Sequence, residues 1–414
     1  MKVCFFNRSY WPDQAATGQL LTELAEDLVD RHNCDVSVVA GRALRADRDE
    51  RVPFGRTQLF RRETHGGVTI LRANGTRFRP QRFTGRFVNY LTYFASAAVA
   101  SMGVGRPDIV VSLTDPPIVG LAALRATRRI GARFVYLCED VFPEVAALLE
   151  DFRSEAANRV LDRINRYLLK RADAIVALGD RMRRRLVDEK GADPDRISVI
   201  HNWADCQAIV PGPKDNAFAR ANGLADRFVL MHSGNIGLSQ NLEVLVEAAS
   251  RLTSRDRLLI AIVGEGSKRE ALEQAAARRG LRNVQFFPYQ PKTLLHESFA
   301  SADAFLVSLK PGIEGYIVPS KLYGALAAGR PYIAAVDPSC EVATIARDYG
   351  CGLLAAPGDP DALAGAIAAM YDDPVTTRLM GQRARSAALQ FDRRVAVRAY
   401  YDLFIRVASV DRAA

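Results

Sequence analysis

Two short glycine-rich loops follow strand-like segments in the second half of the chain. The first is His-Ser-Gly-Asn-Ile-Gly at residues 232–237, and the second is Val-Gly-Glu-Gly-Ser at residues 263–267. Glycine lets backbone amides approach a diphosphate closely at the start of a helix. Each loop alone also suits a tight structural turn, but two on one sheet edge favour a phosphate site. The candidate binding residues are Ser233, Gly234, Asn235, Gly237, Gly264, Glu265 and Gly266.

A third stretch, Glu-Gly-Tyr-Ile-Val-Pro-Ser-Lys at residues 314–321, leads into a helix expected over residues 322–328. Pro319 and Ser320 suit a helix start, whereas a cation at Lys321 opposes the helix dipole. The position of this lysine indicates a bound anion nearby. The alternative is a lysine that points into solvent.

Polar residues also follow expected strands in the first half of the chain. Glu139 and Asp140 come directly after one strand, where a carboxylate can accept a hydrogen bond from a hydroxyl or take a proton. Helix capping or a salt bridge would explain them equally well. Thr17 and Gly18 lie where a loop opens onto a helix, and Asn202 lies at an expected hinge, where it suits either a structural or a ligand-binding role.

Several other kinds of chemistry lack support. His32, His65 and His296 have no partners at metal-ligand or triad spacing. The six cysteines form no Cys-x-x-Cys pair, which favours reduced thiols in the core. Neither half carries Gly-x-Gly-x-x-Gly directly after its first strand, which argues against a dehydrogenase.

The elements that would position these residues alternate between apolar strand-like runs and helical patterns, as in parallel βαβ units. Strands are predicted at residues 2–6, 36–40, 68–72, 108–113, 133–137, 174–177 and 197–200, and then at 228–232, 258–263, 284–287, 304–307, 331–334 and 352–354. At 414 residues the chain suits two α/β domains. We expect two Rossmann-like, doubly wound parallel sheets facing a cleft, each binding ligand at the carboxyl ends of its strands. The expected parts are an N-terminal acceptor-binding domain (1–204), a linker (205–226), a C-terminal nucleotide-binding domain (227–390) and a helix that crosses back to the first domain (391–414).

The net charge of +9 comes largely from residues 42–90, which hold twelve arginines and four acidic residues. Within this stretch basic and aromatic residues are interleaved, among them Arg77, Arg79, Arg82, Arg86, Phe83 and Phe87. A basic, aromatic amphipathic segment can lie on an anionic membrane surface. The alternative is an ordinary helix packed on its sheet. Nucleic acid is a less suitable partner because no recognition fold accompanies the charge.

No apolar run reaches the roughly 18 residues that span a bilayer. The N-terminus has the pattern of a first strand and not of a signal peptide. We therefore expect a cytoplasmic protein, peripheral on the inner face of the plasma membrane.

Taken in order, six motifs carry a family resemblance. They are Asp-x-x-Pro (140–143), Ile-His-Asn-Trp-x-Asp (200–205), Ser-Gly-Asn-Ile-Gly (233–237), Val-Gly-x-Gly (263–266), Val-Pro-Ser-Lys (318–321) and Ala-Ala-Gly-Arg-Pro (327–331). Over nearly its whole length the chain resembles the retaining glycosyltransferases of family 4, which have GT-B architecture. It is most similar to those that build bacterial O-antigen, capsule and exopolysaccharide. The resemblance implies a nucleoside diphosphate sugar on the C-terminal domain, a saccharide acceptor, often lipid-linked, on the N-terminal domain, and no metal requirement.

The resemblance also implies residue roles. Gly234 to Gly237 would line the diphosphate, Gly264 to Gly266 the nucleotide, and Glu314 the donor sugar. The chain departs from its relatives where they carry an arginine and a lysine for the diphosphate, because Asn235 and Gln240 occupy those positions. We expect Lys321 to replace both cations.

A second departure is Gly324, which stands where relatives have a glutamate that holds the ribose. Glu341 is a candidate replacement. The expected catalytic residues are Asp140, Lys321 and Glu314. Relatives are thought to react on one face of the sugar, with the leaving diphosphate helping to take the acceptor's proton, so that no protein nucleophile is needed.

Two other functions fit the same pattern. A GT-B sugar-nucleotide epimerase would share the donor pocket and need no acceptor. A catalytically silent partner of a polysaccharide assembly complex would explain the departures at Asn235, Gln240 and Gly324.

Overall fold

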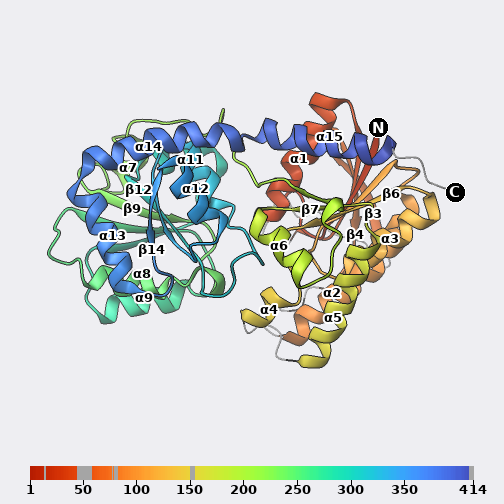
Figure 1. The fold of residues 1–414 in the computed structure, drawn as a ribbon, viewed down its shortest axis with the longest axis horizontal. Helices are drawn as coiled ribbons and strands as arrows, with labels where there is room; N and C mark the ends of the chain where they lie inside the picture. The colour runs from red at the N-terminus through yellow and green to blue at the C-terminus, as the bar shows by residue number, and fades with distance from the viewer. Residues whose placement is uncertain (14, 44–57, 77, 79–82, 150–153, 410–414) are drawn as a thin grey trace. The chain divides into compact units, whose positions relative to one another are not determined.

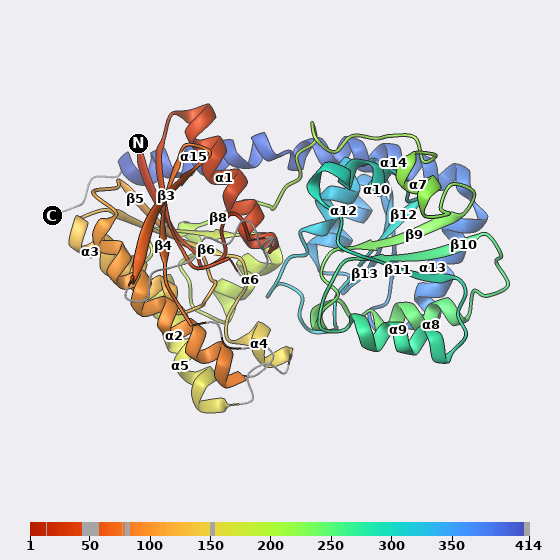
Figure 2. The ribbon, with the colours of Figure 1, turned by 180° about the vertical axis from the view of Figure 1, so that it is seen from behind.

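The computed structural model describes residues 1–13, 15–43, 58–76, 78, 83–149 and 154–409 (Figures 1 and 2). The chain divides into two compact units. Unit 1 comprises Met1–His201, Gly315–Ile317 and Ala396–Ala414, and unit 2 comprises Asn202–Glu314 and Val318–Val395. The first boundary therefore follows His201, and the C-terminal helix changes unit at Ala396.

Unit 1 is built on an eight-stranded sheet in the order β3-β4-β2-β1-β5-β6-β7-β8. The strands are β1 (Lys2–Phe6), β2 (Asp35–Ala40), β3 (Phe60–His65), β4 (Val68–Ala73), β5 (Ile109–Ser112), β6 (Arg133–Cys138), β7 (Ala174–Ala177) and β8 (Ile197–Val199). Seven of these were expected from the sequence. All of the pairings are parallel except that of β3 with β4, which is antiparallel.

The predicted doubly wound parallel sheet is confirmed, but strand β3, which adds an antiparallel pairing at one edge, was missed by the sequence analysis. Its residues read Phe-Arg-Arg-Glu-Thr-His and are only partly buried, because the strand lies at the edge of the sheet. A charged edge strand offers no apolar run for a sequence pattern to detect.

Helices cover both faces of the unit 1 sheet. Helices α2 (Phe83–Ala100), α3 (Val119–Ile130) and α5 (Glu155–Arg171) lie side by side on one face (Figures 1 and 2). Helix α1 (Ala16–His32) packs beside α15 (Arg393–Ser409), where the rings of His32 and Tyr401 stack at 4.2 Å. The shorter α4 (Glu144–Leu148) and α6 (Asp180–Asp188), with the 3-10 turns η2 (Ser101–Gly103) and η3 (Pro194–Arg196), complete the unit.

Unit 2 is built on a six-stranded, wholly parallel sheet in the order β11-β10-β9-β12-β13-β14. The strands are β9 (Phe228–Ser233), β10 (Leu258–Val263), β11 (Val284–Phe287), β12 (Ala304–Ser308), β13 (Tyr332–Ala335) and β14 (Gly352–Ala355), and all six were expected. Every residue of β10 is buried, as a central parallel strand requires.

The helices of unit 2 form two layers. Helices α8 (Glu243–Ser250), α9 (Arg269–Arg278) and α13 (Pro360–Asp372) cover one face, and α11 (Lys321–Ala327), α12 (Glu341–Tyr349) and α14 (Pro374–Ala388) cover the other (Figures 1 and 2). The remaining elements are α7 (Ala217–Ala221), α10 (Leu295–Ala300), η4 (Leu238–Gln240), η5 (Lys292–Leu294) and η6 (Leu389–Phe391). Helix α7 lies within residues 205–226, which the sequence analysis took as linker and turn only.

Candidate functional site

The two glycine loops of unit 2 lie against each other at the carboxyl ends of neighbouring strands. Ser233 at the end of β9 is in register with Val263 at the end of β10. A Cβ atom added to Gly264 would lie 1.9 Å from the carbonyl oxygen of Gly234, and one added to Gly266 would lie 2.1 Å from that of Ile236. Glycine is therefore required at both positions by the close approach of two backbones.

The amides of the first loop already have acceptors within the protein. Those of Gly234 and Ile236 donate to the carbonyls of Val263 and Glu265, each at 2.9 Å. The Gly237 amide donates to Oε1 of Gln240 at 3.0 Å, so this buried glutamine caps the loop. These hydrogen bonds do not support the expectation that the amides of Gly234 and Gly237 are open to a diphosphate. A side-chain cation is therefore a stronger candidate than these amides for binding a diphosphate.

That cation is Lys321, the first residue of α11. Its Nζ lies 3.3 Å from Nε2 of His232, and its Cε lies 3.8 Å from where a Cβ on Gly234 would be. Burial lowers the pKa of Lys321 to about 7. His232 is fully buried, and burial followed by the charge of Lys321 holds its pKa well below the usual value. The structure thus places a half-buried lysine beside a neutral histidine at the glycine loop.

Two glutamates follow the next two strands of the sheet: Glu314 comes after β12, and Glu341 comes after β13. Glu314 is 4% exposed, and its Oε1 has no hydrogen-bond partner among the described residues. Burial, followed by the charges of Glu341 and Glu314, raises the pKa of the Cys340 thiol to about 12. Both carboxylates therefore influence one buried thiol. They are separated by 27 positions in the sequence, and the sheet brings them into one region.

The missing glutamate at Gly324 has a steric explanation. A Cβ atom on Gly324 would lie 2.6 Å from Cε2 of Phe299. The Phe299 ring occupies the space that any side chain at this position would need, so a glutamate does not fit.

Arg269 was missed by the sequence analysis. From the first turn of α9 its Nη1 donates to the carbonyls of Gly264 at 2.6 Å and Phe287 at 2.9 Å. It thereby ties the second glycine loop to the end of β11. A basic residue just after the Gly-x-Gly turn was the available signal.

The remaining candidates in unit 2 are peripheral to these contacts. Asn235 is exposed, Pro319 is buried, and Ser320 forms the N-cap position of α11 without a side-chain hydrogen bond. Glu265 pairs with Arg269 at 2.9 Å. Asn202, an expected acceptor residue, is buried and belongs to unit 2.

In unit 1, polar residues meet at the carboxyl ends of the adjacent strands β1, β5 and β6. Arg8 donates from Nε at 3.1 Å and from Nη2 at 2.9 Å to the two carboxylate oxygens of Asp115. Ser9 donates to the same carboxylate at 2.8 Å. Sequence analysis missed this neutralised pair, although each residue lies two or three positions past a strand end.

Asp115 of this pair interacts electrostatically with Asp140, and Asp140 interacts with Glu139. Burial, followed by the charge of Asp140, raises the pKa of Glu139 to about 8. Burial, followed by the charge of Asp115, raises the pKa of Asp140 to about 7. A carboxyl that titrates near neutral pH can exchange a proton with a substrate hydroxyl.

The other expected acceptor residues lie at the start of α1. Thr17 is its second residue and is half-buried. A Cβ on Gly18 would lie 3.2 Å from the backbone of Ser9, so this glycine permits close packing of the β1 loop.

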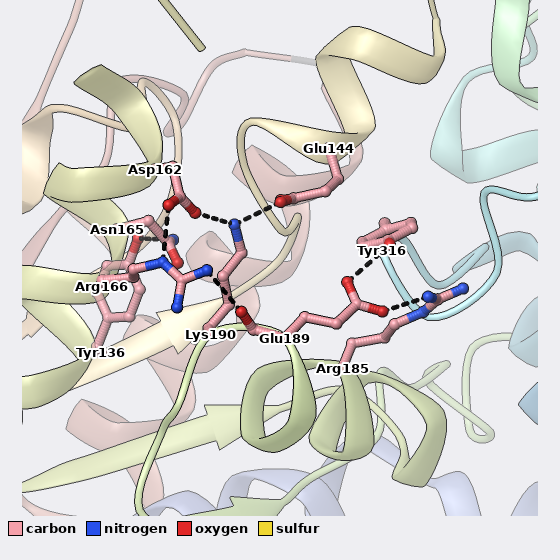
Figure 3. A network of polar contacts seen from close by, with 9 residues as sticks. All are labelled: Tyr136, Glu144, Asp162, Asn165, Arg166, Arg185, Glu189, Lys190 and Tyr316. Atoms are coloured by element: carbon pink, nitrogen blue, oxygen red, sulfur yellow. Dashed lines mark hydrogen bonds and ion pairs between the residues drawn. The ribbon is translucent and has the colours of Figure 1, made fainter. Parts of the chain in front are cut away.

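A polar network fixes the helix that follows Glu139 and Asp140 (Figure 3). The ammonium of Lys190, which is buried, donates to Glu144 of α4 and to Asp162 of α5, each at 2.6 Å. The preceding residue, Glu189, accepts a hydrogen bond from the hydroxyl of Tyr316 at 2.7 Å and pairs with Arg185. Within unit 1 the network joins α4, α5, α6 and the Gly315–Ile317 segment.

Other site types find no support in the part of the chain that the structure describes. No three histidine, cysteine or acidic side chains gather there as a metal site would require. None of the described helices combines the length and apolarity needed to cross a membrane.

Comparison with known proteins gives two family matches. Residues 16–203 match the glycosyl transferase 4-like domain, and residues 214–387 match glycosyl transferases group 1. The probable glycosyltransferase WbjE of Pseudomonas aeruginosa is 31% identical over 271 residues, which cover 63% of this chain and 66% of WbjE. The putative colanic acid biosynthesis glycosyl transferase WcaI of Escherichia coli K12 is 32% identical over 183 residues, covering 43% and 45%. This chain thus spans less than two thirds of either relative.

A solved structure supports the fold. Anabaena HepE in complex with UDP and glucose matches with a TM-score of 0.74 at 17% identity, covering 98% of this chain and 100% of HepE. This match covers both α/β units of the chain, each of which is built on a mainly parallel sheet. The chain belongs to the GT-B glycosyltransferases, and one of its relatives, WcaI, is named for colanic acid biosynthesis.

Proposed function

We propose that this protein is a retaining glycosyltransferase of bacterial surface polysaccharide synthesis. It transfers a sugar from a nucleoside diphosphate sugar, held by unit 2, to a saccharide acceptor that is lipid-linked. The observation that carries the proposal is the half-buried Lys321 at the interlocked glycine loops. The solved relative HepE holds UDP and glucose, and WcaI is named for colanic acid biosynthesis, which supports this substrate class.

In this proposal Lys321 binds the diphosphate and stabilises its negative charge as the bond to the sugar breaks. Burial lowers the pKa of Lys321, and an arriving diphosphate favours the protonated ammonium. No metal ion takes part, so a chelator leaves the rate of transfer unchanged. Glu314, buried with an unpartnered oxygen, accepts hydrogen bonds from hydroxyls of the donor sugar.

On the acceptor side, Asp140 positions the attacking hydroxyl and the leaving diphosphate takes its proton. The oxygen of that hydroxyl forms the new glycosidic bond on the face from which the diphosphate departs, so the anomeric configuration is retained. The protonation state of Asp140 near neutral pH then sets how well it accepts a hydrogen bond from the acceptor.

A lipid-linked acceptor requires contact with a membrane surface. The basic, aromatic segment expected to make that contact lies mainly outside the described residues. Arg77, Arg79 and Arg82 are not described, and Phe83, Arg86 and Phe87 belong to α2 without described side chains. Comparing liposome binding of the wild type with a four-arginine alanine variant tests this segment.

The first experiment is a thermal-shift panel of nucleotides and sugar nucleotides. A ligand at about 100 times its dissociation constant adds roughly 2.7 kcal/mol to the unfolding free energy. The stabilising sugar nucleotide is then incubated with the protein, with and without membrane lipid extract. Sugar transfer to lipid with retained anomeric configuration supports the proposal. Isomerised sugar nucleotide without acceptor supports the epimerase instead, and unchanged polysaccharide production by Lys321→Ala supports the silent partner.

A further inference from the structure

Helix α5 presents a strongly basic exposed face. Arg159, Arg163 and Lys170 recur along it at intervals of four and seven residues, a spacing that aligns them on one stripe of a helix, and Arg171 directly follows Lys170. Arg159, Arg163, Lys170 and Arg171 are all exposed. The stripe therefore offers a linear array of positive charge about four turns long.

The stripe continues onto the neighbouring helix α3. Arg128 donates from Nη2 to the hydroxyl of Tyr167 on α5 at 2.9 Å. The guanidinium groups of Arg128 and Arg171 lie 5.9 Å and 5.6 Å from the centre of the Tyr167 ring. Arg125, one turn before Arg128, is exposed on the same side of α3. We call this surface the basic face: Arg125, Arg128, Arg159, Arg163, Lys170 and Arg171.

The basic face has no acidic partner among the residues that the structure describes. Within the described part of the chain, none of its six cations forms an ion pair with a carboxylate, whereas Arg166 of the same helix pairs with Asp162 at 2.7 Å. The second oxygen of Asp162 is taken by the buried Lys190. Six like charges without counterions repel one another and attract an anionic partner.

Apolar side chains are exposed beside these charges. On α5, Val160 is 52% exposed and Tyr167 is 38% exposed. On α2, which packs against α3, Val88 and Leu91 are 37% and 42% exposed. A bilayer can bind both the cations and the apolar side chains, because its anionic headgroups attract cations and its interface takes up apolar side chains. A nucleic acid backbone would interact favourably with the cations alone.

We propose that the basic face binds the headgroups of an anionic lipid bilayer, with Val160 and Tyr167 entering the interface. This contact is made by helices α3 and α5 and does not use the six basic and aromatic residues between positions 77 and 87 that the sequence singled out. It rests on exposed, described side chains and does not depend on the chemistry proposed for unit 2.

The test compares two triple variants of the full chain with equal loss of charge. The first carries Arg159→Gln, Arg163→Gln and Lys170→Gln. The control carries Arg278→Gln, Arg282→Gln and Arg378→Gln, at exposed cations of unit 2 that have no ion pair among the described residues. Binding is measured by co-sedimentation with phosphatidylcholine vesicles containing about one third phosphatidylglycerol, and with pure phosphatidylcholine vesicles. Thermal unfolding midpoints establish that both variants are folded.

The wild type and the control should bind the anionic vesicles and bind the neutral ones far less. The basic-face variant should bind the anionic vesicles roughly 100-fold more weakly, since each cation near such a surface contributes about a factor of five. Raising the salt concentration should release the wild type. If the triple variant does not fold, Val160→Ser replaces it and should weaken vesicle binding several-fold without changing the salt dependence.

Three results would overturn the proposal. The first is equal vesicle binding by the wild type and the basic-face variant, or by the wild type and Val160→Ser where that variant is used. The second is an equal loss of vesicle binding in both triple variants, which would show that binding depends on the net charge of the protein and not on the basic face. The third is a short RNA duplex that binds the wild type and loses affinity for the basic-face variant while vesicle binding stays intact.

Discussion

The ammonium of Lys321 lies 3.3 Å from Nε2 of His232, and the pair stands at the loop where β9 ends. His232 is fully buried and its pKa is held well below the usual value, so it accepts a hydrogen bond without carrying a second charge. Because the amides of Gly234, Ile236 and Gly237 donate within the protein, this lysine is the candidate group for an incoming diphosphate.

Replacing Lys321 by alanine should weaken binding of the sugar nucleotide that stabilises the protein in the thermal-shift panel by about 10- to 100-fold, the loss of one charge-assisted hydrogen bond. Isothermal titration calorimetry measures this directly. Arg278→Ala, which removes an exposed cation of the same unit, is the control and should leave the affinity unchanged. Equal affinity of wild type and Lys321→Ala would contradict the assignment.

The same lysine predicts a pH dependence. Burial lowers its pKa to about 7, and this pKa should rise when a diphosphate binds, so binding takes up a proton above that pH. Affinity for the same sugar nucleotide should therefore fall as the pH rises from 7 to 9 in the wild type. In Lys321→Ala the affinity should be low and nearly independent of pH. Titrations in buffers of different ionisation enthalpy would reveal the proton uptake.

The glycine loops yield a stability prediction. Gly264→Ala forces a Cβ to within 1.9 Å of the Gly234 carbonyl at a φ of +138°, so we expect a loss of about 3 kcal/mol in unfolding free energy. Gly365→Ala, in helix α13 with nothing near its Cβ, should instead gain about 0.5–1 kcal/mol. Urea unfolding of both variants measures the difference. A stable Gly264→Ala protein would mean that the loops separate easily.

Much of the fold follows from local pattern. Buried parallel strands such as β10 are continuous apolar runs, and their alternation with helices gave thirteen of the fourteen strands. The exception, β3, is charged and lies at an edge. In the site, Lys321 was found because its charge is misplaced for a helix start. Arg8 and Asp115 were not found, because their pairing joins residues 107 positions apart and only the order of the strands brings them together.

The amide assignments illustrate the same limit. A Gly-x-x-Gly spacing predicts a tight loop, but it cannot say which acceptors the amides find. Here the carbonyls of Val263 and Glu265 take two of them. The sequence also does not show that a side chain at position 324 would clash with Phe299, because this clash depends on how α10 packs on α11.

Replacing Asp140 by asparagine should raise the stability of the protein and lower its activity. The pKa of Asp140 is raised to about 7, so the folded protein keeps a proton that the unfolded chain releases between pH 4 and 7. The unfolding free energy therefore falls as the pH rises through this window, and the folded protein at pH 8 carries the cost of a buried charge. Asp140→Asn should stabilise the protein at pH 8 by on the order of 1 kcal/mol and have little effect at pH 4.

The activity of Asp140→Asn should move the other way, with transfer to acceptor reduced by about 10- to 100-fold, the loss of one hydrogen bond to a charged group, while affinity for the stabilising sugar nucleotide is kept. The exposed Asp188 supplies a control, because Asp188→Asn should change neither quantity. Unaltered transfer by Asp140→Asn would remove this residue from the reaction.

The buried ammonium of Lys190 gives the last prediction. It stands between Glu144 and Asp162 at 2.6 Å from each, and its side chain is fully buried (Figure 3). Lys190→Met would remove the cation between Glu144 and Asp162 and leave only Arg166, which pairs with Asp162, so we expect a loss of about 3–5 kcal/mol at pH 7. Adding Glu144→Gln and Asp162→Asn removes the repulsion between these carboxylates and should recover most of the loss. The single variant should also regain stability below about pH 5, where carboxylates take up protons, and urea unfolding at pH 5 and pH 7 measures both effects. A triple variant as unstable as Lys190→Met would show that shape, and not charge, holds α4 and α5 together.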